Sequence, residues 1–184
     1  MFTVTLTKLY DEYGQPAVWA QTWTLADFPS VIELAPGQFK VTVKSPVADR
    51  VSTLAPIYFA EKNFTIVENK VTDLEVVCTV QNMKVTVAPT ANFFTELRNF
   101  TISVSADYEG VDTPVSVSWK DADFVKNADG TYSTSKVAYF EAVPLSVMVT
   151  GLRSLDGSDA SLKEPVKITD VAPRDNHILN IDVQ

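Results

Sequence analysis

One stretch decides the fold: residues 63–88, NFTIVENKVTDLEVVCTVQNMKVTVA, contain the place where a strand alternation breaks and then restarts. Across residues 74–80 the apolar side chains occupy even positions, whereas across residues 83–87 they occupy odd positions. Because the side chains of a strand alternate between its two faces, a slip of one residue turns the buried face over. We therefore predict that the chain leaves one hydrophobic core and enters a second at Gln81-Asn82.

Short alternating segments separated by turn residues recur on both sides of this point. The clearest is FTVTLT at 2–7, and further strands are predicted in the first half at 17–23, 31–34 and 71–80. Strands at such a spacing are typical of β-sandwiches. The long strand at its start, residues 2–8, is predicted to be an edge that could be exchanged with a neighbouring subunit.

The predicted architecture is all-β. It consists of two tandem antiparallel β-sandwiches, transthyretin-like or immunoglobulin-like, over residues 1–81 and 82–184. Residues 89–98, PTANFFTELR, do not alternate and predict one short helix in the second domain.

Composition excludes several classes of function. Fifteen basic and twenty-three acidic residues give a net charge of -8 without any basic cluster, which argues against nucleic acid as a partner. The single cysteine, Cys78, excludes an intramolecular disulfide and a site built from several thiolates. No signal segment or anchoring cysteine is visible at the N-terminus, so membrane attachment is expected only through a lipid anchor absent from this sequence.

Catalytic residues are hard to assemble from this chain. His177 is the only histidine and shares the parity of Leu179 and Ile181, which indicates a position at the rim of a core. The chain contains no nucleophile elbow, phosphate-binding glycine loop or dinucleotide fingerprint. We predict no enzymatic activity, no catalytic residue and no cofactor, although a hydrolase built on scattered carboxylates is a third hypothesis.

An acidic segment at 121–130 resembles a calcium loop, because carboxylates at alternating positions can converge on a hard cation. Val125 occupies a position where such a loop needs a ligand, and an Asp-Gly turn explains the same residues. We therefore predict no metal site.

Aromatic residues near the start suggest a ligand site. Trp19 and Trp23 share one face of a predicted strand, and Tyr10 and Tyr13 belong to the preceding turn. Exposed rings of this kind can stack on a sugar. These four residues are the predicted ligand-binding residues if the protein captures a surface glycan, whereas tryptophans of a sandwich also commonly fill its core.

Several segments carry a resemblance to a known family: IELAPGQFKVTV (32–43), PIYFAEKNFTI (56–66), LEVVCTVQNMKVTV (74–87), NFTISVS (99–105) and AYFEAVPLSVMVTG (138–151). They resemble an uncharacterised family of Bacteroidetes surface lipoproteins, a domain of unknown function. More distantly, the chain is similar to fimbrillins and other major and minor pilin proteins, whose subunits pair two transthyretin-like sandwiches.

The resemblance implies export, a location at the cell surface or outer membrane, and a role in adhesion or fimbrial assembly. The leading hypothesis is a non-enzymatic surface module, a fimbrial-type or adhesive subunit that meets a protein partner or another copy of itself through an edge strand. The alternative is a carbohydrate-binding accessory protein in glycan capture.

Overall fold

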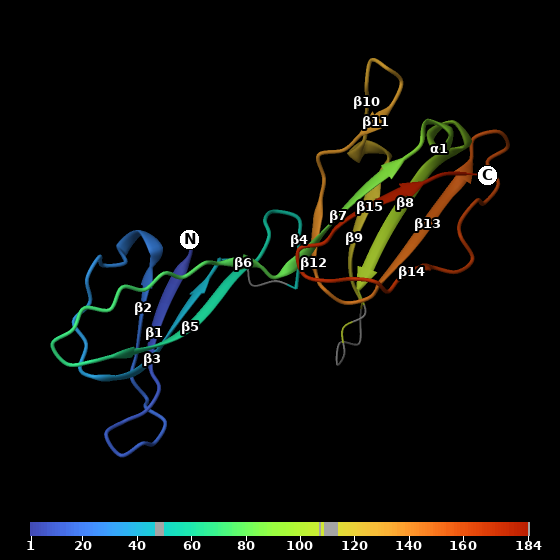
Figure 1. The fold of residues 1–184 in the computed structure, drawn as a ribbon. Helices are drawn as coiled ribbons and strands as arrows, with labels where there is room; N and C mark the ends of the chain where they lie inside the picture. Colours follow the sequence, from blue (N-terminus) through green and yellow to red (C-terminus); the bar gives the residue numbers. More distant parts are fainter. Residues whose placement is uncertain (47–49, 107, 109–113, 184) are drawn as a thin grey trace. The chain divides into compact units, whose positions relative to one another are not determined.

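The computed structural model describes residues 1–46, 50–106, 108 and 114–183, and it is built mostly of strands (Figure 1). The chain divides into two compact units: unit 1 contains Met1–Ala48 and Ile57–Val80, and unit 2 contains Asp49–Pro56 and Gln81–Gln184. The one α-helix of the described residues, α1 (Ala91–Glu96), lies inside the segment where the sequence predicts a helix. The predicted all-β class with one short helix is confirmed.

Unit 1 is a five-stranded antiparallel sheet with the strand order β2-β1-β3-β5-β6. Its strands are β1 (Thr3–Lys8), β2 (Ala20–Thr24), β3 (Gly37–Lys44), β5 (Tyr58–Ile66) and β6 (Thr79–Val80). Apolar and polar residues alternate along β1 and β3, so one face of the sheet is apolar. The buried residues of this face are Val4, Leu6, Phe39, Val41, Val43 and Ala60.

Two extended segments, 31–35 and 71–78, supply side chains that pack against this apolar face. Ile32 and Leu34 from the first segment, and Leu74, Val76 and Cys78 from the second, are half-buried against the core. The predicted strand at 31–34 is wrong, and of the one predicted at 71–80 only Thr79–Val80 is a strand. The side chains alternate as predicted, but these backbones do not join a hydrogen-bonded ladder within the described residues.

The predicted reversal of the buried face is present at Gln81-Asn82. The even-numbered apolar residues of 74–78 pack against the core of unit 1. The odd-numbered residues of 83–87 are buried in the core of unit 2.

The prediction that residues 2–8 form an exchangeable edge is wrong. β1 lies inside the sheet, where Val4 faces Trp23 of β2 on one side and Val43 of β3 on the other. Its backbone is therefore paired on both sides, because the connection through residues 9–19 returns the chain as an additional edge strand.

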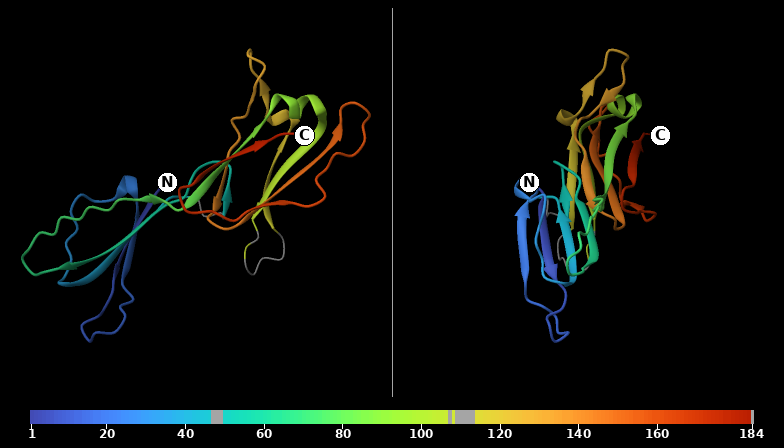
Figure 2. Two further views of the ribbon diagram at one scale, coloured as in Figure 1. Left: turned by 45° about the vertical axis from the view of Figure 1, so that its right-hand side comes forward. Right: turned by 60° about the vertical axis from the view of Figure 1, so that its left-hand side comes forward.

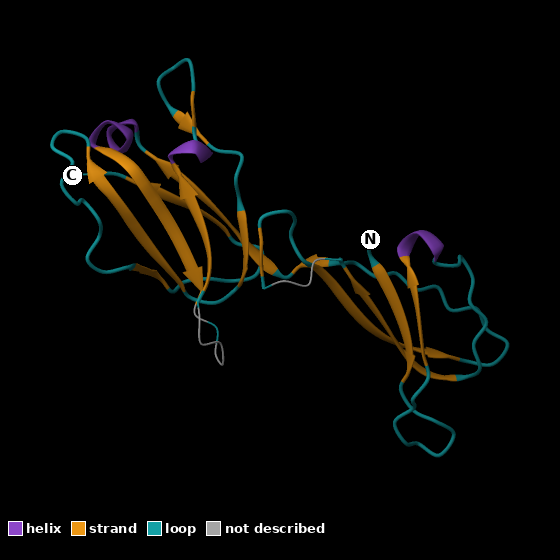
Figure 3. Ribbon diagram, turned by 180° about the vertical axis from the view of Figure 1, so that it is seen from behind, coloured by secondary structure: helices purple, strands orange, loops and turns teal. Residues whose placement is uncertain are grey.

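Unit 2 is a sandwich of two four-stranded sheets (Figures 2 and 3). The first sheet has the order β15-β7-β12-β4, with β4 (Val51–Ser52), β7 (Asn82–Pro89), β12 (Ala138–Glu141) and β15 (Asn176–Ile181). The second has the order β14-β13-β8-β9, with β8 (Leu97–Ala106), β9 (Val115–Lys120), β13 (Leu145–Arg153) and β14 (Val166–Ile168). A separate hairpin pairs β10 (Val125–Lys126) with β11 (Tyr132–Ser133).

The two sheets of unit 2 enclose a continuous core. Trp119, Phe140 and Ile102 are completely buried in it, and the indole N–H of Trp119 donates to the carbonyl of Lys136 at 3.0 Å. One pairing departs from the predicted antiparallel pattern, because β15 runs parallel to β7.

A short piece of the first half of the sequence belongs to unit 2. β4 pairs with β12, where Val51 faces Phe140. The preceding residue, Arg50, lies over the ring of Tyr108 at 4.9 Å, and its carbonyl accepts a hydrogen bond of 3.1 Å from the Tyr108 hydroxyl. β4 therefore closes one edge of the first sheet of unit 2 with residues that lie between β3 and β5 in the sequence.

We expect Tyr108→Phe to lower the free energy of unfolding by about 1 kcal/mol at neutral pH, because the hydrogen bond from Tyr108 is lost and the Arg50 carbonyl keeps only the backbone N–H of Glu141, at 3.2 Å. Burial, with a smaller effect of Glu141, raises the pKa of Tyr108 above its usual value. The contribution of Tyr108 to the free energy of unfolding is therefore fully present below about pH 10, and it is lost as the pH rises through the pKa of Tyr108 in the folded protein. Urea unfolding at pH 7 and at higher pH measures both effects.

The matched control is Tyr13→Phe, because Tyr13 is 80% exposed. If Tyr108→Phe lost stability at alkaline pH as steeply as the wild type, the alkaline loss would not come from Tyr108.

Candidate functional site

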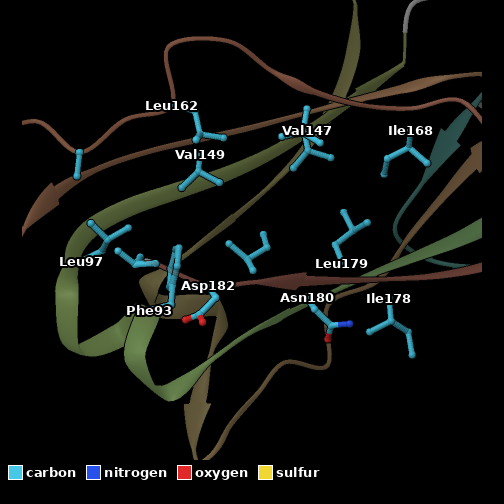
Figure 4. Close-up of a pocket in the computed structure, with 14 residues that line it drawn as sticks. Phe93, Leu97, Val147, Val149, Leu162, Ile168, Ile178, Leu179, Asn180 and Asp182 are labelled. Atoms are coloured by element: carbon cyan, nitrogen blue, oxygen red, sulfur yellow. The ribbon is translucent and has the colours of Figure 1, made fainter.

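An open apolar groove lies in unit 2 between β15 of one sheet and β13 and β14 of the other (Figure 4). Its volume is about 630 Å³. We call it the β15 groove, and its lining residues are Phe93, Leu97, Val147, Val149, Ala160, Leu162, Val166, Ile168, Ile178, Leu179, Asn180, Ile181, Asp182 and Val183.

The groove exposes apolar surface that a closed sandwich would bury. Val166 is 57% exposed and Leu162 is 41% exposed. Ile178 is 56% exposed on the outer face of β15, because it alternates with Leu179 and Ile181, which pack against the core. Phe93 of α1 and Leu97 of β8 are buried and belong to the core. The sandwich is therefore incompletely covered along this side.

β15 presents an open edge beside the groove. It is the end strand of its sheet, and in the described residues its only strand neighbour is β7. The backbone N–H of Lys84 donates to the Asp175 carbonyl at 2.8 Å, and that of Thr90 donates to the Ile181 carbonyl at 2.9 Å. In a parallel ladder alternate residues point toward the partner strand, so the backbone groups of 176, 178 and 180 point outward.

The far end of β15 is fixed to the start of α1. The hydroxyl of Thr90 donates to the carboxylate of Asp182 at 2.5 Å and also accepts from the backbone N–H of Phe93 at 3.2 Å. The side-chain amide of Asn92 donates to the Val183 carbonyl at 2.8 Å. These bonds hold the edge strand in place although it has a neighbour on one side alone.

The Thr90 hydrogen bond is the main reason why the pKa of Asp182 lies below its usual value. Asp182 is the only ionisable residue among those that line the groove. The groove thus offers one negative charge at the end of an otherwise apolar surface.

The residues that the sequence predicts as ligand-binding lie in unit 1, outside this groove. Tyr10 and Tyr13 are 48% and 80% exposed, and Trp19 is 40% exposed with an edge-to-face contact to Phe39 at 6.0 Å. All three lie in the connection between β1 and β2. Trp23 is half-buried against the unit 1 core, edge-to-face with Phe28 at 5.5 Å.

The structure therefore separates the two tryptophans. Trp23 serves the core and Trp19 remains partly accessible beside the two tyrosines. Sequence parity places both indoles on one face correctly, but it does not show that this face is the one that packs onto the core of unit 1.

Carboxylates of the acidic segment at 121–130 accept hydrogen bonds from neighbouring protein groups. The carboxylate of Asp121 accepts from the backbone N–H groups of Asn99 and Phe100, each at 3.0 Å. Asp129 accepts from the side chain and backbone of Thr131, which lowers its pKa. In the described residues no group of three or more His, Cys, Asp or Glu side chains is arranged to hold a metal.

The β15 groove was not found from the sequence. The strand over 178–183 is predicted, and Val166 and Ile178 are visible as apolar residues. What the sequence does not show is that β15 is an end strand and that it faces β13 across an uncovered gap.

Residues 12–184 match the model of a family described as a domain of unknown function, DUF4493. The chain belongs to the DUF4493 family. The expected membership in a domain of unknown function is thus confirmed. No curated protein matches this DUF4493 chain.

Solved structures similar to the DUF4493 chain include a candidate cell adhesion protein of Bacteroides fragilis NCTC 9343. The TM-score is 0.46 at 12% identity, and the match covers 100% of this chain and 81% of that one. The major pilin of Streptococcus pyogenes matches with a TM-score of 0.27 at 11% identity, over 98% of this chain and 89% of that one.

None of the helices in the described part of the chain is long and apolar enough to span a membrane.

We expect Asp182→Asn to lower stability at neutral pH, and the difference from wild type to vanish in acid. The carboxyl pKa is lowered in the folded state, so its contribution is present above about pH 4 and is lost as the pH falls through the folded pKa. Thermal unfolding between pH 7 and pH 2 measures this difference.

Thr90→Ser keeps the hydroxyl donor and should retain the wild-type pH dependence. An equal difference between Asp182→Asn and wild type at both ends of the pH range would show that the carboxylate is not stabilised by this bond.

Proposed function

We propose that this protein is a non-enzymatic cell-surface module of the adhesion or structural class, and that it binds an extended strand of a protein partner along β15. The observation that carries the proposal is the open edge of β15 beside an apolar groove. Export and a surface location are supported by the sequence resemblance to surface lipoproteins.

An added strand would satisfy both features of the site. Its backbone would pair with the outward groups at 176, 178 and 180, which is how an exposed sheet edge binds a peptide. Every second side chain would then point between the two sheets, toward Val149, Leu162 and Ile168. Backbone pairing would supply affinity, and the apolar groove would select the side chains.

The groove also restricts the kind of strand that fits. Its lining is apolar apart from Asn180, Asp182 and backbone groups. A partner strand should therefore alternate apolar and polar residues, and it should not place a carboxylate near Asp182, since like charges repel.

The probe for this site is a peptide with the sequence of residues 2–8, FTVTLTK, because its apolar residues alternate with threonine. We expect saturable binding to the full chain by fluorescence polarisation. The control FVLTTTK has the same composition without the alternation, and it should bind at least about tenfold more weakly because its side chains cannot all reach one face.

Asn180→Pro is the decisive variant, because proline removes one outward N–H and leaves the inward ladder with β7 intact. It should weaken binding of the alternating peptide by about tenfold, as expected for a lost hydrogen bond with an unpaired group. Asn180→Ala keeps the N–H and should bind as wild type. Equal binding by both variants, or by both peptides, would refute strand addition at β15.

A second candidate function is glycan capture by the connection between β1 and β2, which presents three exposed rings. The loop is ordered by backbone hydrogen bonds from Ala17 to Leu9 and from Asp11 to Gln15, and by the carboxylate of Asp11, which accepts from the N–H groups of Tyr13 and Gln15. Tyr13 projects from it with 80% of its surface exposed. Aromatic rings on an ordered loop are suited to stacking on a sugar.

For this second candidate we expect Tyr13→Ala to weaken binding to any polysaccharide retained on a glycan array by about two- to tenfold, through loss of a stacked ring. Val18→Ala is the control, because Val18 is fully exposed in the same connection and has no ring. An array without any retained glycan, or an equal loss in both variants, would exclude this function.

A further inference from the structure

We propose that unit 1 holds a second, independent binding site: a groove for a single alkyl chain whose head group carries no negative charge. The groove has a volume of about 710 Å³ and lies between the apolar face of the sheet and residues 25–34 and 72–78. Its size falls in the range of small-molecule sites. The inference does not depend on strand binding at β15, which concerns unit 2.

The floor of this groove is a sheet face made of side chains alone. Val4 and Leu6 of β1, Val41 and Val43 of β3, and Phe64 and Ile66 of β5 line it. The backbone groups of β1 and β3 are paired on both sides, and β5 is paired with β3 along its length, so the middle of the floor offers a ligand no hydrogen-bonding partner. A peptide would bring unpaired polar groups onto this surface at a cost, whereas an alkyl chain has none to satisfy.

The walls are apolar and incompletely buried. Ile32, Leu34, Leu74, Val76 and Cys78 line them, and each packs against the core while remaining partly exposed. Six apolar residues of unit 1 are buried in the described part of the chain, and the wall residues that pack on them would gain from further cover. A ligand that covers these walls therefore removes apolar surface from water.

The charge of the lining selects the head group. Its polar members are Ser30, Thr72 and Asp73, and no Lys, Arg or His is among the lining residues. An anionic head group would meet the Asp73 carboxylate, and the nearby Lys62 ammonium already donates to the Glu75 carbonyl at 2.8 Å. An uncharged or cationic head group can instead lie beside the hydroxyls of Ser30 and Thr72 and the carboxylate of Asp73 without repulsion.

Cys78 provides a reporter inside the site, because it is the only cysteine and its side chain lines the groove. Dodecyltrimethylammonium and dodecanoate have chains of matched length and opposite head charge. Below their micelle concentrations, we expect dodecyltrimethylammonium to bind saturably and to slow the reaction of Cys78 with a thiol reagent. Dodecanoate should bind more weakly and protect Cys78 less.

Reversing the charge of Asp73 distinguishes binding in this groove from general attraction of a cation to an acidic protein. Asp73→Lys should shift the preference toward dodecanoate by about two- to fivefold, the effect of an exposed ion pair. Glu68→Lys changes the net charge equally, but Glu68 is exposed and is not a lining residue. Glu68→Lys should therefore keep the wild-type preference between the two amphiphiles. Circular dichroism checks that all variants are folded.

Three results would overturn the proposal. The first is no saturable binding of dodecyltrimethylammonium, and the second is binding that leaves the reaction rate of Cys78 unchanged. The third is equal behaviour of Asp73→Lys and Glu68→Lys. Protection of Cys78 by the alternating peptide FTVTLTK, with none by either amphiphile, would assign the groove to a peptide strand and so refute the alkyl-chain proposal.

Discussion

The structure depends on the two-residue period of the β-strand and on its reversal at Gln81-Asn82. A strand can bury one set of alternate side chains in one core, and a second core on the other side requires the parity to change. Residues 74–80 and 83–87 meet this requirement within a single short stretch. The division of apolar residues between two cores follows from that change of parity.

The two cores differ in how completely they are covered. Among the described residues, unit 2 buries seventeen apolar residues between two sheets, whereas unit 1 buries six between one sheet and two irregular segments. In unit 2 the β15 groove lies where β15 ends its sheet. In unit 1 the groove lies between the sheet and irregular segments whose apolar side chains are half-buried.

Polar groups stabilise the places where strands lack neighbours. The end of β15 is tied to α1 through Thr90, Asp182 and Asn92. At the other border of the same sheet, Arg50 and Tyr108 secure β4. These hydrogen bonds compensate in part for the missing ladder partners at the two borders of the sheet.

The sequence by itself determined the all-β class, the helix near residues 91–96 and the change of buried face, because alternation and its interruption are local properties of the chain. It also placed Trp19 and Trp23 on one face. Only the tertiary structure decided that β1 is internal, that 31–35 and 71–78 stay outside any ladder, that β4 joins unit 2 and that β15 is an open edge. Each of these depends on which distant segment lies beside a strand, and side-chain periodicity contains no information about that neighbour.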